Sequence, residues 1–264
     1  MLKIALIPSA VSPGNGARGH FLTTYLVNEA IAIDAGSLGL IGDLAAQAAV
    51  TDVFLTHSHM DHIASLPLFL DTVFGGPTVT LHASAATLDS LRRDLFNDRV
   101  WPDLLAIQTD GRPAVRIQTL EPFQPTEVAG LKMTPVPVDH VVPTLGFLIE
   151  SADGTSVAIP SDTGPTEEFW RWARGLAGLR AVFLECSFPD ELGGLAATSQ
   201  HLTPALFAAE ARKLNRELPL IAVHIKPRYY DEVARQLGAL GLPGVEVGTS
   251  GRAYRFGPPE GGQP

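Results

Sequence analysis

Residues 53–62 read Val-Phe-Leu-Thr-His-Ser-His-Met-Asp-His, and this stretch decides the fold. Its first three residues are apolar, which is typical of a short buried strand. Three histidines and one aspartate then follow within six residues. In an extended chain the alternate positions His57, His59 and Asp61 point the same way. His62 comes where a helical pattern begins. Because imidazole and carboxylate groups suit zinc, manganese and iron, the run predicts a metal site.

A surface loop that happens to be rich in histidine is the alternative explanation of this run. The strand-to-helix context favours the metal site, because that context is what a metal-binding motif requires. Four ligands on one loop can also be divided between two ions. We therefore expect a site that holds more than one cation.

Four further segments share one design, an apolar strand that ends in His, Asp or Glu. They are 134–140 (TPVPVDH), 156–162 (SVAIPSD), 181–185 (AVFLE) and 220–224 (LIAVH). Strand ends from different parts of a sheet can converge on one edge, where α/β folds commonly build their sites. We therefore expect these polar residues to meet the histidine-rich run at one rim of the molecule.

Short apolar runs alternate with helical patterns along the chain. The expected strands are 1–8 (MLKIALIP), Ile31–Ile33, Val53–Leu55, Val79–Leu81, Met133–Val138, Gly146–Ile149, Val157–Ile159, Ala181–Leu184 and Leu220–Val223. The expected helices are Leu44–Ala49, Ala64–Val73, Ala85–Phe96, Glu167–Leu176, Pro204–Leu214 and Asp231–Leu240. Thr203 followed by Pro204 predicts a helix start, with Thr as the cap. Strands mixed with helices predict sheets covered by helices.

The composition is that of a globular protein, with 45% hydrophobic residues among 264. We expect a single domain over residues 1–257 and a flexible tail over 258–264. No apolar stretch reaches the roughly 18 residues that span a bilayer, so no membrane partner is expected. The lone Cys186 cannot form an internal disulfide, which predicts a cytoplasmic location.

The formal net charge is −9. This charge disfavours a nucleic-acid partner, because sequence-independent binding to nucleic acid needs a basic surface. It does not exclude a phosphate substrate, since divalent cations in a cleft outweigh the overall balance locally.

The segment Thr56–His62 resembles the H-x-H-x-D-H signature of the metallo-β-lactamase superfamily, and similar segments extend from 33–36 (IDAG) to 223–224. The resemblance implies an α/β fold, a four-layer αββα sandwich with two sheets face to face and helices outside. It also implies two divalent metal ions as cofactors, with Zn²⁺ favoured and Mn²⁺ or Fe as alternatives. The implied ligands are His57, His59 and His140 for the first ion, Asp61, His62 and His224 for the second, and Asp162 as the bridge.

Other segments resemble the class II cyclic-nucleotide phosphodiesterases. They are 139–149, 161–165 (SDTGP), 185–188 (ECSF), 201–204 (HLTP) and 224–227 (HIKP). This resemblance implies that a metal-activated hydroxide hydrolyses 3′,5′-cyclic nucleotides, cAMP or cGMP, to 5′-nucleotides. It also suggests a homodimer.

Four residues are candidates for catalysis, namely Asp61, Asp162, Glu185 and His201. Asp162 would bridge the ions and orient the hydroxide. His201 lies just before a predicted helix start, which favours an anion, and would act as a general acid or contact the phosphate. Glu185 would hold the His201 ring in place. The alternative for Glu185 is that it braces a loop by accepting backbone N–H groups.

Two other activities stay open on this scaffold. Ribonuclease Z has the same seven-ligand pattern, but usually carries a long arm between the third His and the bridging Asp. His140 and Asp162 are only 22 residues apart here, too close for such an arm. A thioester or lactone hydrolase would use the same metals.

Four further polar residues have less certain roles. Asp34 is predicted to hydrogen-bond to a ligand histidine rather than to bind metal. His82 is predicted to be structural, and His20 is either a contact to the site or a loop anchor. Lys226 follows His224 and either meets the substrate phosphate or lies in a solvated turn.

Overall fold

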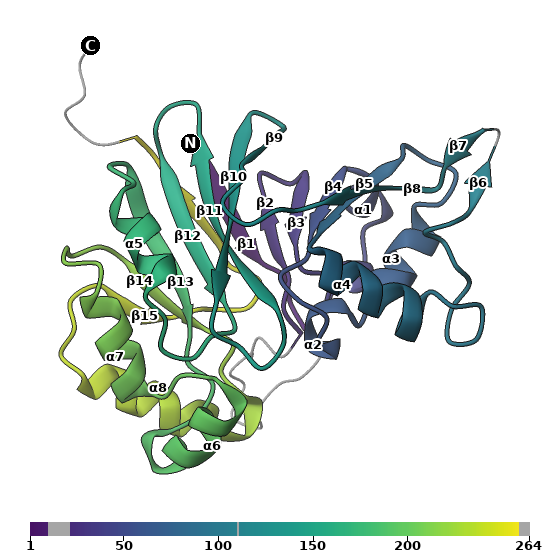
Figure 1. Ribbon diagram of the computed structural model, residues 1–264. Helices are drawn as coiled ribbons and strands as arrows, with labels where there is room; N and C mark the ends of the chain where they lie inside the picture. Colours follow the sequence, from purple (N-terminus) through teal and green to yellow (C-terminus); the bar gives the residue numbers. More distant parts are fainter. Residues whose placement is uncertain (10–21, 110, 259–264) are drawn as a thin grey trace.

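The computed structural model describes residues 1–9, 22–109 and 111–258. Within them lie two seven-stranded sheets and a small hairpin of β6 (Gln108–Thr109) and β7 (Arg112–Pro113). Figure 1 shows the strands of the two large sheets in the middle of the molecule, with helices on both outer sides. This arrangement confirms the predicted four-layer αββα sandwich.

The first sheet mixes antiparallel and parallel pairs. In order of pairing, its strands are β16 (Ala253–Phe256), β1 (Leu2–Leu6), β2 (Tyr25–Val27), β3 (Ile31–Ile33), β4 (Asp52–Phe54), β5 (Val79–Ala83) and β8 (Val115–Thr119). The run from β3 to β8 is parallel, so these strands end at the same rim. Helices cross over between them: α1 (Leu44–Ala48), α2 (Met60–Ile63), α3 (Leu66–Thr72) and α4 (Ala85–Ser90).

The second sheet has the same mixture. Its strands are β15 (Val245–Val247), β14 (Leu220–Val223), β13 (Leu179–Glu185), β12 (Ser156–Ser161), β11 (Thr144–Ser151), β10 (Leu131–Val138) and β9 (Thr126–Val128). The strands from β12 to β15 are parallel and again end at one rim. Its helices are α5 (Glu168–Arg174), α6 (Gly193–Ser199), α7 (Pro204–Arg212) and α8 (Tyr230–Ala239).

Alternate residues of each strand enter different hydrophobic cores. Phe54 of β4 and Phe147 of β11 meet between the sheets, with ring centroids 5.5 Å apart. Val53, the neighbour of Phe54, faces the core under the helices of the first sheet. In the second sheet, Phe183 likewise faces the core between the sheets, and its neighbour Val182 faces the core under the helices. Both faces of these strands are therefore buried, which explains why the sequence shows them as continuous apolar runs.

All nine expected strands are present, and most helix ends differ from expectation by a few residues. The Thr203 side chain accepts from the Leu206 N–H and Pro204 is the first helical residue, which confirms the predicted helix start. The helix expected from residue 64 starts at Leu66, after the separate turn α2. The sequence did not predict α6, because two glycines at its start have low helix propensity.

Two predictions fall on residues whose structure is not described. His20 lies outside the described residues. The tail predicted from residue 258 also lies outside them, apart from Pro258 itself. Among the residues that are described, none of the helices has both the length and the apolar character to cross a bilayer.

Gly36 allows the loops that contain Asp61 and Thr23 to pack closely against its own loop. A Cβ added at Gly36 would lie 2.1 Å from the Asp61 carbonyl oxygen and 2.6 Å from the Thr23 backbone nitrogen. Gly36 also donates its N–H to the Thr23 carbonyl at 2.9 Å. Both obstacles are backbone atoms, so neither can move without shifting its loop.

Replacing Gly36→Ala should therefore lower the free energy of unfolding by about 1–3 kcal/mol, the usual cost of overpacking. Gly42→Ala is the matched control, because a Cβ there meets nothing within 4 Å. Urea denaturation of both variants checks the prediction. Equal midpoints for the two variants would contradict it.

Candidate metal centre

The polar residues that end the strands meet at one rim of the sandwich. The histidine-rich run follows β4 and passes into α2, which lies at the lower rim in Figure 1. His140 follows β10, Asp162 follows β12 and His224 follows β14. The fold thus brings together polar residues that lie far apart in the sequence, from His57 to His224, as the sequence pattern predicted.

Their ligand atoms fall into two main groups. One group comprises His57, His59, His140 and Asp162, and the other comprises Asp61, His62 and His224. Within each group the candidate ligand atoms all lie within 4.8 Å of one another. A third group, Asp162, His201 and His224, shares Asp162 with the first group and His224 with the second. The first two groups divide the five histidines as the resemblance implies.

Asp162 lies between the two groups. Its Oδ2 atom is 3.3 Å from His62 Nε2 and 3.4 Å from His224 Nε2. The same oxygen is 3.8 Å from His57 Nε2 in the other group. This carboxylate is therefore placed to serve both groups.

Backbone strain accompanies this placement. Ser161, directly before Asp162, has φ of 64°, and His224 has φ of 57°. Asp34, at the end of β3, has φ of 60°. A left-handed conformation is costly for residues other than glycine and is tolerated where the surrounding structure enforces it, often at functional sites.

Hydrogen bonds hold the two buried imidazoles of the histidine-rich run. His62 Nδ1 donates to Asp34 Oδ2 at 2.6 Å, which confirms the predicted supporting role of Asp34. His57 Nδ1 lies 2.9 Å from the Thr56 hydroxyl, which itself donates to Asp34. Both rings consequently turn Nε2 towards the cluster. Supporting bonds of this kind orient metal-binding histidines and fix their tautomer.

The second sheet orients two more rings in the same way. His140 Nδ1 donates to the Gln200 carbonyl at 3.1 Å. His224 Nδ1 lies 3.1 Å from the Ser187 hydroxyl. Their Nε2 atoms therefore also face the cluster. His59 differs, because it presents Nδ1, which lies 3.2 Å from His140 Nε2.

The electrostatics favour the uncharged form of four of the five candidate ligand imidazoles. Burial lowers the pKa of His57, His59 and His224, and it lowers the pKa of His140 to about 4. Burial would lower the pKa of the fifth, His62, but the charges and hydrogen bonds of Asp162 and Asp34 raise it well above its ordinary value. Burial would raise the pKa of Asp162, but the imidazoles of His224, His62 and His57 around it hold that pKa well below its ordinary value. The cluster thus combines four imidazoles that favour the neutral form with an ionised carboxylate, and a cation bound at His62 would displace the proton of that ring.

These residues fit divalent cations. Within the described part of the chain, the buried His57 Nε2 atom has no hydrogen-bond partner. His62 Nε2 and His224 Nε2 face each other at 3.4 Å, although each ring donates through Nδ1. Nitrogen lone pairs and carboxylate oxygens that converge in this way suit Zn²⁺, Mn²⁺ or Fe.

Glu185 and His201 lie beside this cluster and form the predicted pair. His201 Nδ1 donates to Glu185 Oε1 at 2.6 Å. Burial would lower the pKa of His201, but the charge and hydrogen bond of Glu185 raise it. Glu185 also accepts from the backbone N–H groups of Thr163 and Ser187, so it braces the loops as well. Glu185 therefore makes the contacts that both interpretations require.

Ser187 is a residue whose role the sequence did not predict. Its hydroxyl donates to Glu185 Oε2 at 3.0 Å and lies against His224 Nδ1. It therefore connects the Glu185–His201 pair to a candidate ligand. A serine two residues after a strand-ending glutamate gives no signal on its own, because its contact to His224 joins distant parts of the chain.

Lys226 contacts the cluster, whereas His82 does not. The ammonium group of Lys226 donates to Asp61 Oδ2 at 3.1 Å and lies 3.5 Å from His224 Nε2, so it reaches the cluster. His82 lies away from it, hydrogen-bonded to Asp52 at 2.7 Å and stacked on Phe54. Its place between the sheets agrees with a structural role.

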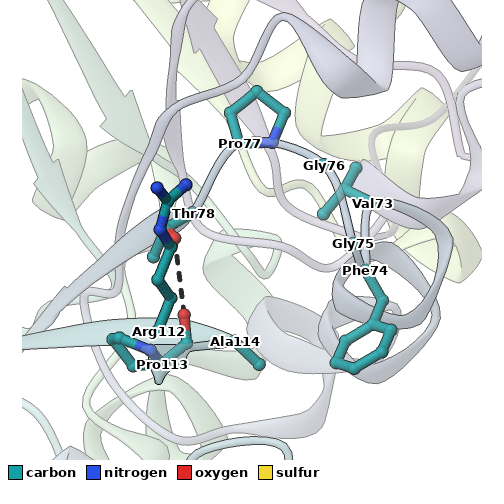
Figure 2. Close-up of a pocket in the computed structure, with 9 residues that line it drawn as sticks. All are labelled: Val73, Phe74, Gly75, Gly76, Pro77, Thr78, Arg112, Pro113 and Ala114. Atoms are coloured by element: carbon teal, nitrogen blue, oxygen red, sulfur yellow. Dashed lines mark hydrogen bonds between the residues drawn. The ribbon is translucent and has the colours of Figure 1, made fainter. Parts of the chain in front are cut away.

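A separate cavity of about 440 Å³ lies at the other rim, where β5 and β8 begin. Figure 2 shows its lining, with the Thr78 hydroxyl donating to the Pro113 carbonyl and the Phe74 ring turned away from this hydrogen bond. Arg112 is the charged side chain among its described lining residues. This cavity has no pair of acid and base groups and no set of metal ligands, so it does not compete with the cluster as a catalytic site.

Comparison with known proteins agrees with this geometry. A family model described as a β-lactamase superfamily domain matches residues 37–225, which include the candidate ligands from both sheets. The chain belongs to the metallo-β-lactamase superfamily. It is therefore a hydrolase of the metallo-β-lactamase fold, a fold that implies divalent metal ions.

Several named proteins are similar to this chain. A probable 3′,5′-cyclic-nucleotide phosphodiesterase of Yersinia pestis is 26% identical over 257 residues, covering 86% of this chain and 71% of that protein. A ribonuclease Z of Mycobacterium bovis is 30% identical over 148 residues, about half of each chain. Unliganded yeast PDE1 has a similar fold, with a TM-score of 0.76 at 17% identity, over 96% of this chain and 98% of that one.

Lys226 should weaken cation binding at the neighbouring group of Asp61, His62 and His224. Its ammonium group occupies the Asp61 carboxylate at 3.1 Å and would repel a divalent ion held by these side chains. Lys226→Met should therefore tighten binding of the weaker metal equivalent by about threefold to tenfold. Calorimetric titration of metal-free protein with Zn²⁺ and with Mn²⁺ measures this change.

Lys132→Met is the matched control, since Lys132 pairs with Glu150 on β11, away from the cluster. It removes the same charge and should leave both metal affinities unchanged. Weaker metal binding in Lys226→Met would contradict the prediction.

Proposed function

We propose that this protein is a dinuclear metal-dependent phosphodiesterase that hydrolyses 3′,5′-cyclic nucleotides to 5′-nucleotides. The observation that carries the proposal is the position of the Asp162 carboxylate between two groups of histidines. The similarity to a probable cyclic-nucleotide phosphodiesterase over most of the chain supports the choice of substrate.

In this proposal seven side chains hold two divalent cations. His57, His59 and His140 would hold one, Asp61, His62 and His224 would hold the other, and the Asp162 carboxylate would be available to both, because it lies between the two groups. When bound, the cations supply positive charge that polarises the phosphoryl group and makes water a better nucleophile. Asp162 accepts a hydrogen bond from the attacking water and so directs its oxygen towards phosphorus.

His201 acts on the leaving group. Glu185 holds its Nδ1, so Nε2 is the nitrogen that can reach the substrate. Water adds across the bond between phosphorus and the 3′ oxygen. Its oxygen joins phosphorus as the bond to the 3′ oxygen breaks, and His201 delivers a proton to that departing oxygen. The proton that the water gives up then restores His201. The product is a 5′-monophosphate with a 3′ hydroxyl.

The structure of the segment between His140 and Asp162 favours a small substrate over transfer RNA. This segment is filled by β11, a short turn and β12, which pair as an antiparallel hairpin. It therefore has no room for an RNA-binding arm. The net charge of −9 points the same way.

His201→Ala should lower kcat for cAMP by about 10²- to 10⁴-fold, the usual contribution of a general acid. The loss should be much smaller for bis-p-nitrophenyl phosphate, because p-nitrophenolate leaves without a proton. Steady-state kinetics with both substrates tests this difference. Metal content, measured by elemental analysis, should stay at the wild-type value. Equal losses on both substrates would refute the role of His201.

A substrate panel tests the proposed activity itself. Metal-reconstituted protein should hydrolyse cAMP or cGMP, and His59→Ala should abolish this activity. Precursor transfer RNA, a thioester and a lactone should be turned over poorly. Cleavage of the transfer RNA or the lactone without turnover of either cyclic nucleotide would contradict the proposal.

A further inference from the structure

A second hollow lies on the same rim as the metal centre. It has a volume of about 340 Å³, within the roughly 300–1,000 Å³ range of small-molecule sites. We call it the proline pocket, because Pro122, Pro137 and Pro143 line it together with Ala86 and Glu121. Its lining is mostly apolar.

The proline pocket adjoins the metal centre through two elements. One wall is the segment on either side of the His140 loop, from Pro137 to Leu145. Leu145 donates its N–H to the Thr56 carbonyl at 3.0 Å, directly beside the first histidine of the cluster. The other wall follows the ends of β5 and β8, which run parallel to β4 and end at the same rim.

The pocket is formed by ordered chain. Leu145 and Thr144 are buried, and the Thr144 hydroxyl donates to the Val142 carbonyl at 2.9 Å. Phe123 donates its N–H to the Pro135 carbonyl at 2.8 Å, which fixes the loop carrying Glu121 against β10. A preformed pocket loses little entropy when a ligand enters.

We propose that the proline pocket binds the nucleobase of the substrate, an inference that rests on the proposed function. Proline rings present flat apolar faces on which a planar base can lie. Among the described lining residues, Glu121 carries the one formal charge. Its carboxylate can accept hydrogen bonds from the exocyclic amino group of adenine or guanine. The phosphate of the bound nucleotide would then lie at the metal centre, and the exocyclic amino group of its base would lie at Glu121.

The variant Ala86→Trp tests the pocket by filling it. Ala86 is exposed and is the second residue of α4 after the Ser84 cap, so an added ring does not disturb a core. The matched control is Ala45→Trp. Ala45 is exposed at the same position of α1, after the Asp43 cap. The two substrates are cAMP and the 3′,5′-cyclic phosphate of ribose without a base.

Ala86→Trp should raise the KM for cAMP by about tenfold or more, the size of effect seen when a stacked base loses its platform. The base-free cyclic phosphate should react equally with Ala86→Trp, Ala45→Trp and wild type. Equal KM values for cAMP in all three proteins would overturn the pocket assignment and leave the phosphodiesterase intact. Wild-type turnover of the base-free compound but of neither cAMP nor cGMP would overturn both.

A second pair of variants tests the polar contact. Glu121→Gln should raise the KM for cAMP severalfold, whereas Glu127→Gln should not. Glu127 is also exposed, lies on β9 and does not line the pocket. A KM for cAMP that is the same in both variants would exclude Glu121 as a base contact.

Discussion

The structure depends on one electrostatic constraint, the convergence of imidazole nitrogens and carboxylates in a largely buried space. His62 Nε2 and His224 Nε2 lie 3.4 Å apart, and His140 Nε2 lies 3.2 Å from His59 Nδ1. Burial disfavours a proton on His59, His140 and His224, so their nitrogen lone pairs converge on the cluster. His62 differs, because the carboxylates of Asp162 and Asp34 raise its pKa. Burying polar groups costs free energy unless each group has a partner. Divalent cations are the partner that satisfies nitrogen and carboxylate donors together.

The sandwich supplies this convergence through its parallel strands. Each sheet contributes a run of parallel strands that ends at the same rim, and the loops after them carry the ligands. Left-handed residues such as Ser161 and His224 turn the chain sharply at those ends. Asp34, Thr56 and Ser187 then orient the rings from behind. The strained backbone at the strand ends and the hydrogen bonds to the rings therefore act together to position the ligand atoms.

Much of this site could be predicted from the sequence, because its central motif is contiguous and its other members end apolar strands. His57 to His62 are local, and His140, Asp162 and His224 each follow a strand that the hydrophobic pattern identifies. The orienting contacts could not be predicted in the same way. Ser187 reaches His224, and the Gln200 carbonyl reaches His140 across 60 residues of sequence. A backbone carbonyl has no residue signature, and short strands such as β16 depend on pairing with distant partners.

The most direct test of the account is a crystal structure of metal-reconstituted protein with anomalous diffraction data collected at the metal absorption edge. Two peaks per chain are predicted, one bounded by His57, His59 and His140 and the other by Asp61, His62 and His224, with the Asp162 carboxylate between them. A single peak, or peaks away from these side chains, would contradict the claim that this rim holds a pair of cations.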